Sequence, residues 1–345
     1  MVILKQVLGV DVAQKELVVS LGKMFSDFSI EIYAHNIFKN SEKGMDELLQ
    51  WVKKLTLDDS KVFYVMEATG VYHERFAYFL DENSCDLSIV MPNKISNYMR
   101  TLDIKTVTDK SCSAAITQFG LERKLTIWKK PNKIYKNLKQ LTRERDQIVE
   151  ARAVIKNQLH AEKSEVYPIK NTIKRCEAHI KFLNKQESQI LKEIEGVKDQ
   201  EIKNKIAKIT TIPGVGVLTA TIILAETNGF ELIKNKKQLT SYAGLDIKEK
   251  QSGTSIKGKP KISKKGNKSI RRAMHFPALS AIRHDENYKK IYANLVSRSG
   301  IKMKGVVAVQ RKILELIYVI YKNDTNYDID YEKKKREQHE MDTLA

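Results

Sequence analysis

The first 125 residues alternate between segments patterned for strands and segments patterned for helices, and this order limits the folds open to the chain. QVLGVDVAQ and KELVVSLG follow each other closely, as the strands of a hairpin do, and FSIEIYAH is a third alternating strand. EKGMDELLQWVKKL has helical spacing, and KVFYVMEATG is a buried strand. The helix VYHERFAYFLDEN, the strand DLSIVMP ended by Pro92, and a helix at about residues 110–121 complete the unit. We therefore predict a mixed sheet with helices packed on it.

Three acidic residues stand at the ends of elements in this pattern. The order of elements is ribonuclease-H-like, and in such a sheet the first and fourth strands are neighbours. Asp11 ends the first strand, Glu67 ends the fourth, and Asp109 begins the helix that follows. Each alone is an ordinary strand-end or helix-capping acid. Together they are expected to converge on one edge of the sheet, where Mg²⁺ would neutralise their mutual repulsion.

A second region, residues 131–200, begins at Pro131 and has heptad-like apolar spacing on either side of Pro168. It predicts two long helices, which would form either an antiparallel pair or a dimerising coiled coil. A third region, residues 205–325, begins with a helix-hairpin-helix pattern around ITTIPGVGVLTATIILAET. Gly214 and Gly216 permit a tight turn whose N–H groups would face a phosphate. Helices are expected at 267–283 and 304–321, followed by a polar, frayed tail at 326–345.

Charge is distributed unevenly along the chain, whose net charge is +19. Residues 1–120 carry 13 Lys/Arg and 16 Asp/Glu, and the remaining 225 residues carry 48 and 26. The first part therefore has a net charge of −3 and the second of +22, which predicts a polyanionic partner for the second part. Solvated lysine-rich helices are the alternative. No apolar run is long enough to span a membrane, and the three cysteines show no metal or disulfide spacing, so a reducing cytoplasmic location is expected.

The basic residues are densest between Lys257 and Arg272, where eight of sixteen residues are Lys or Arg. Phosphate contacts are expected from this run, at Lys257, Lys259, Lys264, Lys265, Lys268, Arg271 and Arg272. A Ser252–Gly253 step precedes the run. Taken alone, such a step is most simply a loop in which the serine makes a turn.

Motifs distributed along nearly the whole chain resemble those of one family. They are GVDVAQKELVV, MEATGVYHERFAYFL, KTVTDKSCSAAITQFG, IPGVGVLTATIILAE, QLTSYAGLD, QSGTSIKGKPKISKKGNKSIRRAMHFPALSAIRH and GVVAVQRKILELIYVIY. In this order they are similar to the DEDD-type insertion-sequence transposases of the "insertion sequence one-ten" group, which includes Piv-like DNA invertases. The resemblance implies a RuvC-like domain, a coiled coil and a C-terminal transposase domain.

The resemblance also implies a function and its residues. DNA would be cut and rejoined between donor and target by a multimer, a dimer to a tetramer, guided by a structured bridge RNA and associated with the nucleoid. The family's first three acids fall on Asp11, Glu67 and Asp109. The fourth acid falls on Cys112, whose thiol is a poor ligand for Mg²⁺. The chain would then be a weakened copy, manage with three carboxylates and water, or use Asp103 instead.

The resemblance places a nucleophilic serine at Ser252, with Ser255 as the nearest competitor. Attack on a phosphodiester would give a 5′-phosphoserine link that conserves the bond for rejoining. Two other functions stay open at this point. One is a RuvC-like nuclease or resolvase that uses metal and water alone. The other is a nucleic-acid-binding relic that is disabled at Cys112.

Overall fold

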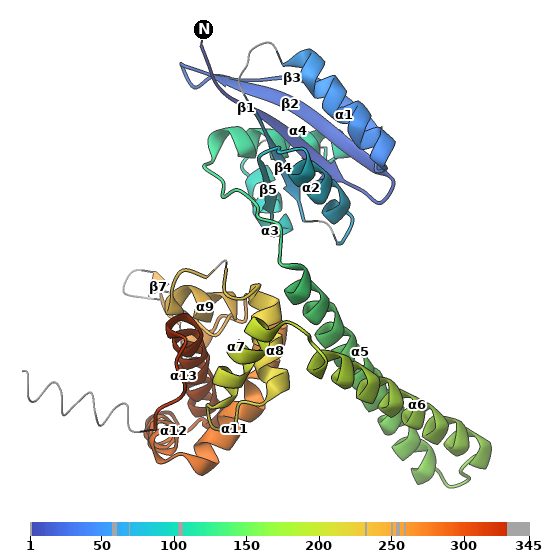
Figure 1. Ribbon diagram of the computed structural model, residues 1–345, viewed down its shortest axis with the longest axis vertical. Helices are drawn as coiled ribbons and strands as arrows, with labels where there is room; N and C mark the ends of the chain where they lie inside the picture. Colours follow the sequence, from blue (N-terminus) through green and yellow to red (C-terminus); the bar gives the residue numbers. More distant parts are fainter. Residues whose placement is uncertain are drawn as a thin grey trace, which may run out of the picture. The chain divides into compact units, whose positions relative to one another are not determined.

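The computed structural model describes residues 2–56, 61–68, 70–102, 106–231, 233–249, 251–252, 256–258 and 260–329. Its internal contacts divide the chain into two compact units, Met1–Lys130 and Pro131–Ala345 (Figure 1). The division falls at Pro131, where the sequence predicts a boundary.

The first unit is built on a five-stranded mixed sheet in the order β3-β2-β1-β4-β5. The strands are β1 (Ile3–Val12), β2 (Glu16–Phe25), β3 (Ile30–Lys39), β4 (Val62–Glu67) and β5 (Leu87–Val90). The first three are antiparallel neighbours, while β4 pairs in parallel with both β1 and β5. The predicted adjacency of the first and fourth strands is therefore confirmed.

Helices cover both faces of this sheet, because alternate residues of each strand point to opposite sides. On one face, Leu8 and Val10 of β1 pack with α1 (Glu42–Leu55) and α2 (His73–Glu82). On the other face, Val7 of β1 packs with α3 (Pro92–Met99) and α4 (Asp109–Glu122). The sequence analysis did not find α3. Pro92 ends the strand as predicted, but it also occupies the first turn of a new helix, where its fixed φ is favourable.

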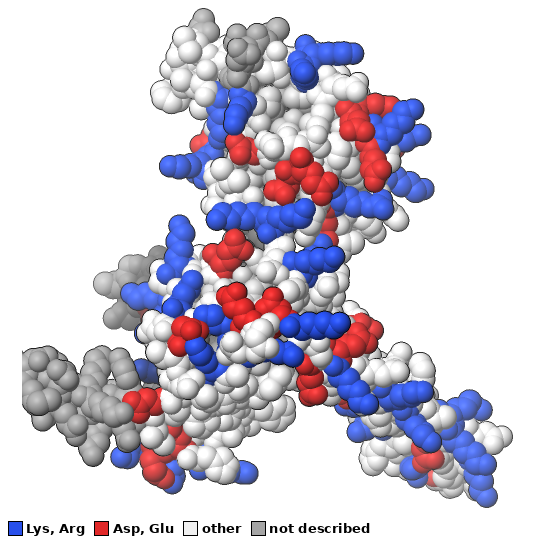
Figure 2. All heavy atoms as spheres, in the orientation of Figure 1, with Lys and Arg blue, Asp and Glu red and all other residues white. Residues whose placement is uncertain are grey.

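The second unit begins with two long antiparallel helices, α5 (Lys133–Ser164) and α6 (Lys170–Glu195). Ion pairs join them: Arg145 contacts Glu187, and Lys163 contacts Glu177 closer to the connection between the two helices. Figure 2 shows Lys and Arg side chains along much of the visible surface of this pair. The break near Pro168 lies where the sequence predicts it. Of the two arrangements left open, the antiparallel pair within one chain is present.

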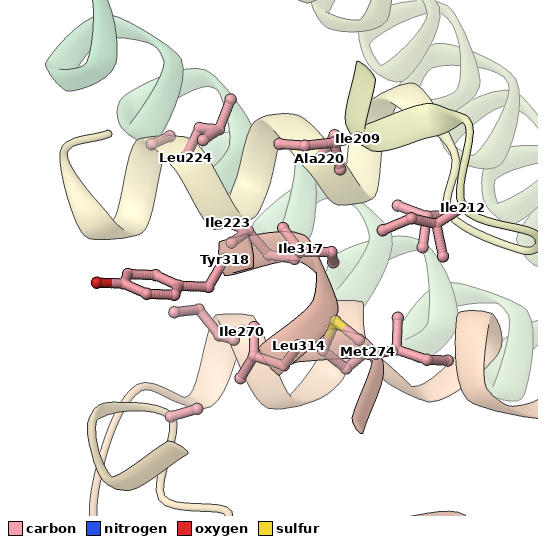
Figure 3. Close-up of a cluster of buried hydrophobic side chains, with 14 of the residues drawn as sticks. Ile209, Ile212, Ala220, Ile223, Leu224, Ile270, Met274, Leu314, Ile317 and Tyr318 are labelled. Atoms are coloured by element: carbon pink, nitrogen blue, oxygen red, sulfur yellow. The ribbon is translucent and has the colours of Figure 1, made fainter. Parts of the chain in front are cut away.

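Seven further helices form the rest of this unit among the described residues. They are α7 (Gln200–Thr210), α8 (Val217–Thr227), α9 (Lys236–Tyr242), α10 (Lys268–Ala273), α11 (His275–His284), α12 (Glu286–Ser299) and α13 (Lys302–Asn323). Leu314 and Ile317 of α13 lie at the centre of their core, against Ile223 of α8 (Figure 3). The helix expected at 267–283 is α10 followed by α11, and α12 was not predicted.

Between α9 and α10 the chain forms short antiparallel ladders. The strand β6 (Ile247–Lys248) pairs with β9 (Lys261–Ile262), and β7 (Gln251–Ser252) pairs with β8 (Ile256–Lys257). After α13, Tyr327 donates its backbone N–H to Thr211 Oγ1 at 2.8 Å, and its hydroxyl to Asp285. The start of the expected frayed tail is therefore anchored; residues 330–345 lie outside the described part. Within the described ranges, no helix combines the length and apolar content that a membrane span requires.

Candidate active site

Asp11 and Glu67 lie at the carboxyl ends of two neighbouring parallel strands. In the β1–β4 ladder Val10 is the partner of Met66, so each acid is the next residue along its strand. The pleat places Asp11 on the same face as Val7, and Glu67 on the same face as Val65. Val7 and Val65 both belong to the core beneath α4. The two carboxylates are therefore on the side of the sheet that α4 covers.

The third acid, Asp109, is the first residue of α4. Thr108 caps this helix by accepting the N–H of Ser111, whose hydroxyl accepts the N–H of Thr108 in return. This reciprocal capping box fixes the first turn, which carries Asp109. Cys112 follows three residues later, one turn further along the same helix.

A close approach of α4 to the sheet brings this helix to the two strand-end acids. Gly9 makes the approach possible, since a Cβ there would lie 2.3 Å from the backbone nitrogen of Thr117. Thr117 Oγ1 accepts the Gly9 N–H at 3.1 Å and donates to the Ser20 carbonyl oxygen at 2.8 Å. The hydroxyls of Ser20 and Ser113 are 2.8 Å apart and buried. These bonds fix the position of α4 on β1 and β2.

The acids influence one another electrostatically. Burial raises the pKa of Asp11 above its ordinary value, and the negative charge of Asp109 raises it further. Burial likewise raises the pKa of Glu67, with a further contribution from Asp11. Such mutual repulsion is typical of carboxylates that share a cation.

Cys112 lies within the field of all three acids. Burial raises the pKa of its thiol, and Asp11, Asp109 and Glu67 each raise it further. The thiol is therefore protonated and uncharged at neutral pH, at the position where the resemblance leads us to expect a fourth carboxylate.

The carboxylates of Asp11, Glu67 and Asp109 suit a hard divalent cation, because they offer oxygen ligands and negative charge. Within the described ranges, no three His, Cys, Asp or Glu side chains surround one metal position. Cation binding would therefore require these side chains to rotate toward a common point. Asp103, the alternative fourth acid, lies outside the described residues.

The predicted serine lies in the ladder between α9 and α10. The backbone of Ser252 pairs with Ile256, and that of Gln251 with Lys257. Gly253, Ser255 and Lys259 lie outside the described residues. At the base of the ladder, Ser263 donates its backbone N–H to the Asp246 carbonyl at 2.9 Å, and its hydroxyl to the Asp246 carboxylate.

The other predicted phosphate-binding residues divide into two groups. Lys264, Lys265 and Lys268 are exposed. The two arginines already have partners, as Arg271 donates to the backbone carbonyls of Ala243 and Gly266, and Arg272 pairs with Glu150. Arg271 therefore stabilises the base of the ladder.

Two family profiles match this chain. The profile described as "Transposase", of the DEDD type of IS110, matches residues 8–168, and "Transposase IS116/IS110/IS902 family" matches residues 206–293. The first range contains Asp11, Glu67, Asp109 and Cys112, and the second contains Ser252 and the basic run that follows it.

The chain belongs to the IS110-type DEDD transposases.

Two curated proteins and one solved structure are similar to this transposase over different shares of its length. A pilin gene-inverting protein of Moraxella bovis is 25% identical over 330 residues, which cover 94% of this chain and 98% of that protein. The transposase for insertion sequence element IS1111A of Coxiella burnetii is 27% identical over 161 residues, 43% of each chain. A Thermus thermophilus RuvC structure is 9% identical, with a TM-score of 0.28, over 36% of this chain and 99% of that one.

A buried ionic cluster in the transposase was missed by the sequence analysis. The side chain of Glu226 on α8 is fully buried, and it accepts hydrogen bonds from Arg143 Nε and from Asn267 Nδ2, each at 2.7 Å. Burial alone would raise the pKa of Glu226, but the Arg143 and Asn267 bonds and the charge of Lys139 outweigh it and hold the pKa below its ordinary value. The signal was a lone acid in the apolar run TATIILAET.

The glycine turn of the transposase lies between α7 and α8. Gly214 has φ +84°, and a Cβ there would lie 2.9 Å from Ser280 Cβ, so the turn packs closely on α11. Gly216 is the N-cap of α8, has open space around it, and leaves the helix without a side-chain cap. These are the features that the phosphate-binding prediction needs.

Trp128 and His73 have structural places in the first unit. Trp128 packs edge-to-face on Tyr78, with ring centroids 5.5 Å apart, and its backbone N–H donates to the Leu87 carbonyl at 2.7 Å. His73 is the first residue of α2.

Proposed function

We propose that this protein is a metal-dependent DNA recombinase that cuts and rejoins DNA during transposition or inversion. The observation that carries the proposal is the placement of Asp11 and Glu67 at adjacent strand ends, on the face where α4 presents Asp109. The raised pKa of both strand-end acids supports it. The membership in the IS110-type transposases supports DNA as the substrate.

Asp11, Glu67 and Asp109 would hold the cation, for which the oxygen donors favour Mg²⁺. When bound, Mg²⁺ would supply positive charge against the developing charge of a phosphoryl transfer. The contribution of the chain itself is to hold the three carboxylates on fixed elements.

Ser252 would act as the nucleophile. Its Oγ would attack the phosphorus of a phosphodiester, forming an Oγ–P bond as the bond to the 3′-oxygen breaks. The hydroxyl proton would pass to a base, and the leaving oxygen would take a proton to become a 3′-hydroxyl. The 5′-phosphoserine keeps the energy of the broken bond, so attack by another 3′-hydroxyl reseals DNA in a new arrangement.

The basic residues would hold the substrate. Lys257, Lys259, Lys264, Lys265 and Lys268 would contact phosphates, as would the uncapped start of α8 at Gly216. The affinity for DNA should therefore fall steeply with salt.

The remaining partners follow from the family resemblance. The protein would bind donor and target DNA with a structured guide RNA encoded beside its gene, and act at the nucleoid as a homo-oligomer, a dimer to a tetramer. Co-purification of a structured RNA from cells carrying the gene with its flanks tests the guide; loss of that RNA when the flanks are deleted is the expected result.

A covalent-adduct assay tests the proposed chemistry. Wild-type protein, Ser252→Ala and Asp11→Asn are each incubated with Mg²⁺, matched RNA and a 3′-labelled donor duplex, because the 5′-phosphoserine link retains the fragment on the 3′ side of the break. We expect a protein–DNA adduct with wild type alone. Cleavage without an adduct by Ser252→Ala would instead identify a RuvC-like nuclease that uses metal and water.

A second candidate function is nucleic-acid binding without strand exchange. The observation that favours it is Cys112, an uncharged thiol that leaves the acid cluster with three carboxylates. It predicts DNA and RNA binding by the wild type with no adduct, and an adduct once Cys112→Asp is introduced.

A further inference from the structure

An exposed face of α10 and α11 combines positive charge with large apolar side chains. Residues 268, 272, 276, 279 and 283 follow one another at intervals of four, four, three and four, so they lie on one side of a helix. All five are exposed. We refer to this set, Lys268, Arg272, Phe276, Leu279 and Arg283, as the α10–α11 stripe.

The stripe lies on a rigid element. Met274 joins α10 to α11 with φ −79° and ψ −8°, and helical hydrogen bonds continue across it, from the Met274 N–H to Ile270 at 3.0 Å and from the Ala278 N–H to Met274 at 3.2 Å. The opposite side is buried, with Ile270, Met274, Ala278 and Ala281 at 0% exposure (Figure 3 shows Ile270 and Met274 pointing into the core). At 1.5 Å per residue, the stripe extends about 22 Å along the axis.

Phe276 is the notable member, because its side chain is 77% exposed and Leu279 beside it is 40% exposed. The rings of Phe276 and His275 form an edge-to-face pair, with centroids 5.7 Å apart. Phe276 and Leu279 lie on the same side of the helix between basic side chains, and exposed apolar residues that adjoin one another within a polar rim mark interaction surfaces.

The charge around the ring indicates what kind of partner would cover it. Residues 250–284 contain ten Lys/Arg and no Asp/Glu. Within the described part of the chain, neither Lys268 nor Arg283 makes an ion pair, while Arg272 pairs with Glu150. A second copy of this chain would bring its own basic residues against these, whereas a nucleic acid would bring phosphates.

The uncapped start of α8 lies alongside the stripe. A Cβ on Gly214 would lie 3.0 Å from the Pro277 carbonyl and 2.9 Å from Ser280 Cβ, so this turn packs against α11 itself. Gly216, two residues on, opens α8 and faces open space. The turn that leads into this helix start, which suits a phosphate, therefore packs on the same helix that carries the exposed ring.

We propose that Phe276 is a stacking platform for an unpaired base, with Arg283 and Lys268 binding phosphates on either side of it. The inference rests on the proposed nucleic-acid function and adds to it a contact with single-stranded DNA or RNA. Any base can stack on an aromatic ring, because every base has a π face. The contact would therefore bind an unpaired base without selecting its sequence. Leu279 would support the edge of the stacked base.

Fluorescence of a single-stranded oligonucleotide containing one 2-aminopurine tests this contact. Stacking on an aromatic ring quenches 2-aminopurine. We expect wild-type protein to quench it and Phe276→Ala to lose most of the quenching, with affinity reduced roughly 5- to 100-fold. Phe276→Trp should restore both. Parallel DNA and RNA probes show which strand uses the platform.

Two controls separate the possible failures. Phe28→Ala removes an aromatic of similar exposure, 74%, from the first unit, and it should bind like wild type. Arg283→Gln should reduce the slope of log affinity against log salt concentration by about one, because one phosphate contact is lost. Phe276→Ala should leave that slope unchanged. Wild-type protein that binds neither probe would contradict the proposed function itself.

If Phe276→Ala binds and quenches like wild type, the platform is wrong while the proposed function stands. If Phe276→Ala binds like wild type but changes from dimer to monomer in analytical ultracentrifugation, the stripe is a self-association surface, and the proposal is overturned in favour of a second copy.

Discussion

Asn267 Nδ2 lies 2.7 Å from Glu226 Oε2, so the residue that caps α10 is held by a buried carboxylate on α8. Asn267 Oδ1 in turn accepts the N–H of Ile270. The basic helix that follows the serine ladder therefore begins at a position set by the core of the second unit. The charge of that core acid is balanced by Arg143 on α5.

Replacing Glu226 by Gln should destabilise the second unit. The substitution keeps the volume but removes the negative charge that balances Arg143, and it replaces one of the two accepting oxygens by an NH₂ group that cannot accept a hydrogen bond. We expect a loss of about 1–3 kcal/mol in the free energy of unfolding, measured by urea denaturation. Glu144→Gln, an exposed change on α5 beside Arg143, should cost less than about 0.5 kcal/mol. Equal stability of the two variants would contradict the assigned role.

The same carboxylate predicts an acid-dependent loss of stability. Because the pKa of Glu226 is lowered in the folded chain, its contribution is fully present above the ordinary value of 4.5 and is lost as the pH falls through the folded pKa. The difference in unfolding free energy between wild type and Glu226→Gln should therefore shrink below pH 4.5. A difference that stays constant on acidification would show that Glu226 has no such linkage.

Gly9→Ala should disturb the acid cluster without touching an acid. The added Cβ would lie 2.3 Å from Thr117 N and 2.4 Å from Thr117 Oγ1, so α4 must move off β1. We expect a destabilisation of about 1–3 kcal/mol in thermal unfolding and a loss of DNA cleavage, since Asp109 moves with the helix. For the unfolding measurement alone, Gly216→Ser is the matched control, because that position has open space and serine is a favourable helix cap, so it should not lower the melting temperature.

The sheet and the positions of its acids could be predicted because each strand and helix is indicated by the pattern of its own residues. Alternating residues and strand order place Asp11 and Glu67 side by side, and the Thr108 cap marks the start of α4. The features that were missed depend on tertiary context. No residue of α12 is buried, so its apolar pattern is weak, and the partners of Glu226 lie 83 and 41 residues away in sequence.

Asp11→Asn should stabilise the metal-free protein while it abolishes chemistry. The raised pKa of Asp11 means that its ionised form is disfavoured by folding, so this acid lowers stability as the pH rises through its folded pKa. Removing the charge should add on the order of 1 kcal/mol near neutral pH, and lower the pKa of Glu67 toward its ordinary value. Thermal unfolding in a chelating buffer measures the first effect, and a decrease in stability would contradict it.

Cys112→Asp should shift the cluster toward stronger cation binding. A fourth carboxylate one turn after Asp109 adds an oxygen ligand and more negative charge, so the metal-free variant should be less stable than wild type. Magnesium should then raise its melting temperature more than that of wild type, and should bind more tightly in isothermal titration calorimetry.

Cys112→Ser distinguishes the effect of adding a negative charge from the effect of removing the thiol. It offers an oxygen but no charge, so its magnesium affinity should stay near that of wild type. If Cys112→Asp gains both magnesium affinity and adduct formation, the thiol limits the wild-type reaction. If wild type already forms the adduct as fast as Cys112→Asp, three carboxylates suffice for the chemistry and the binding-only function is excluded.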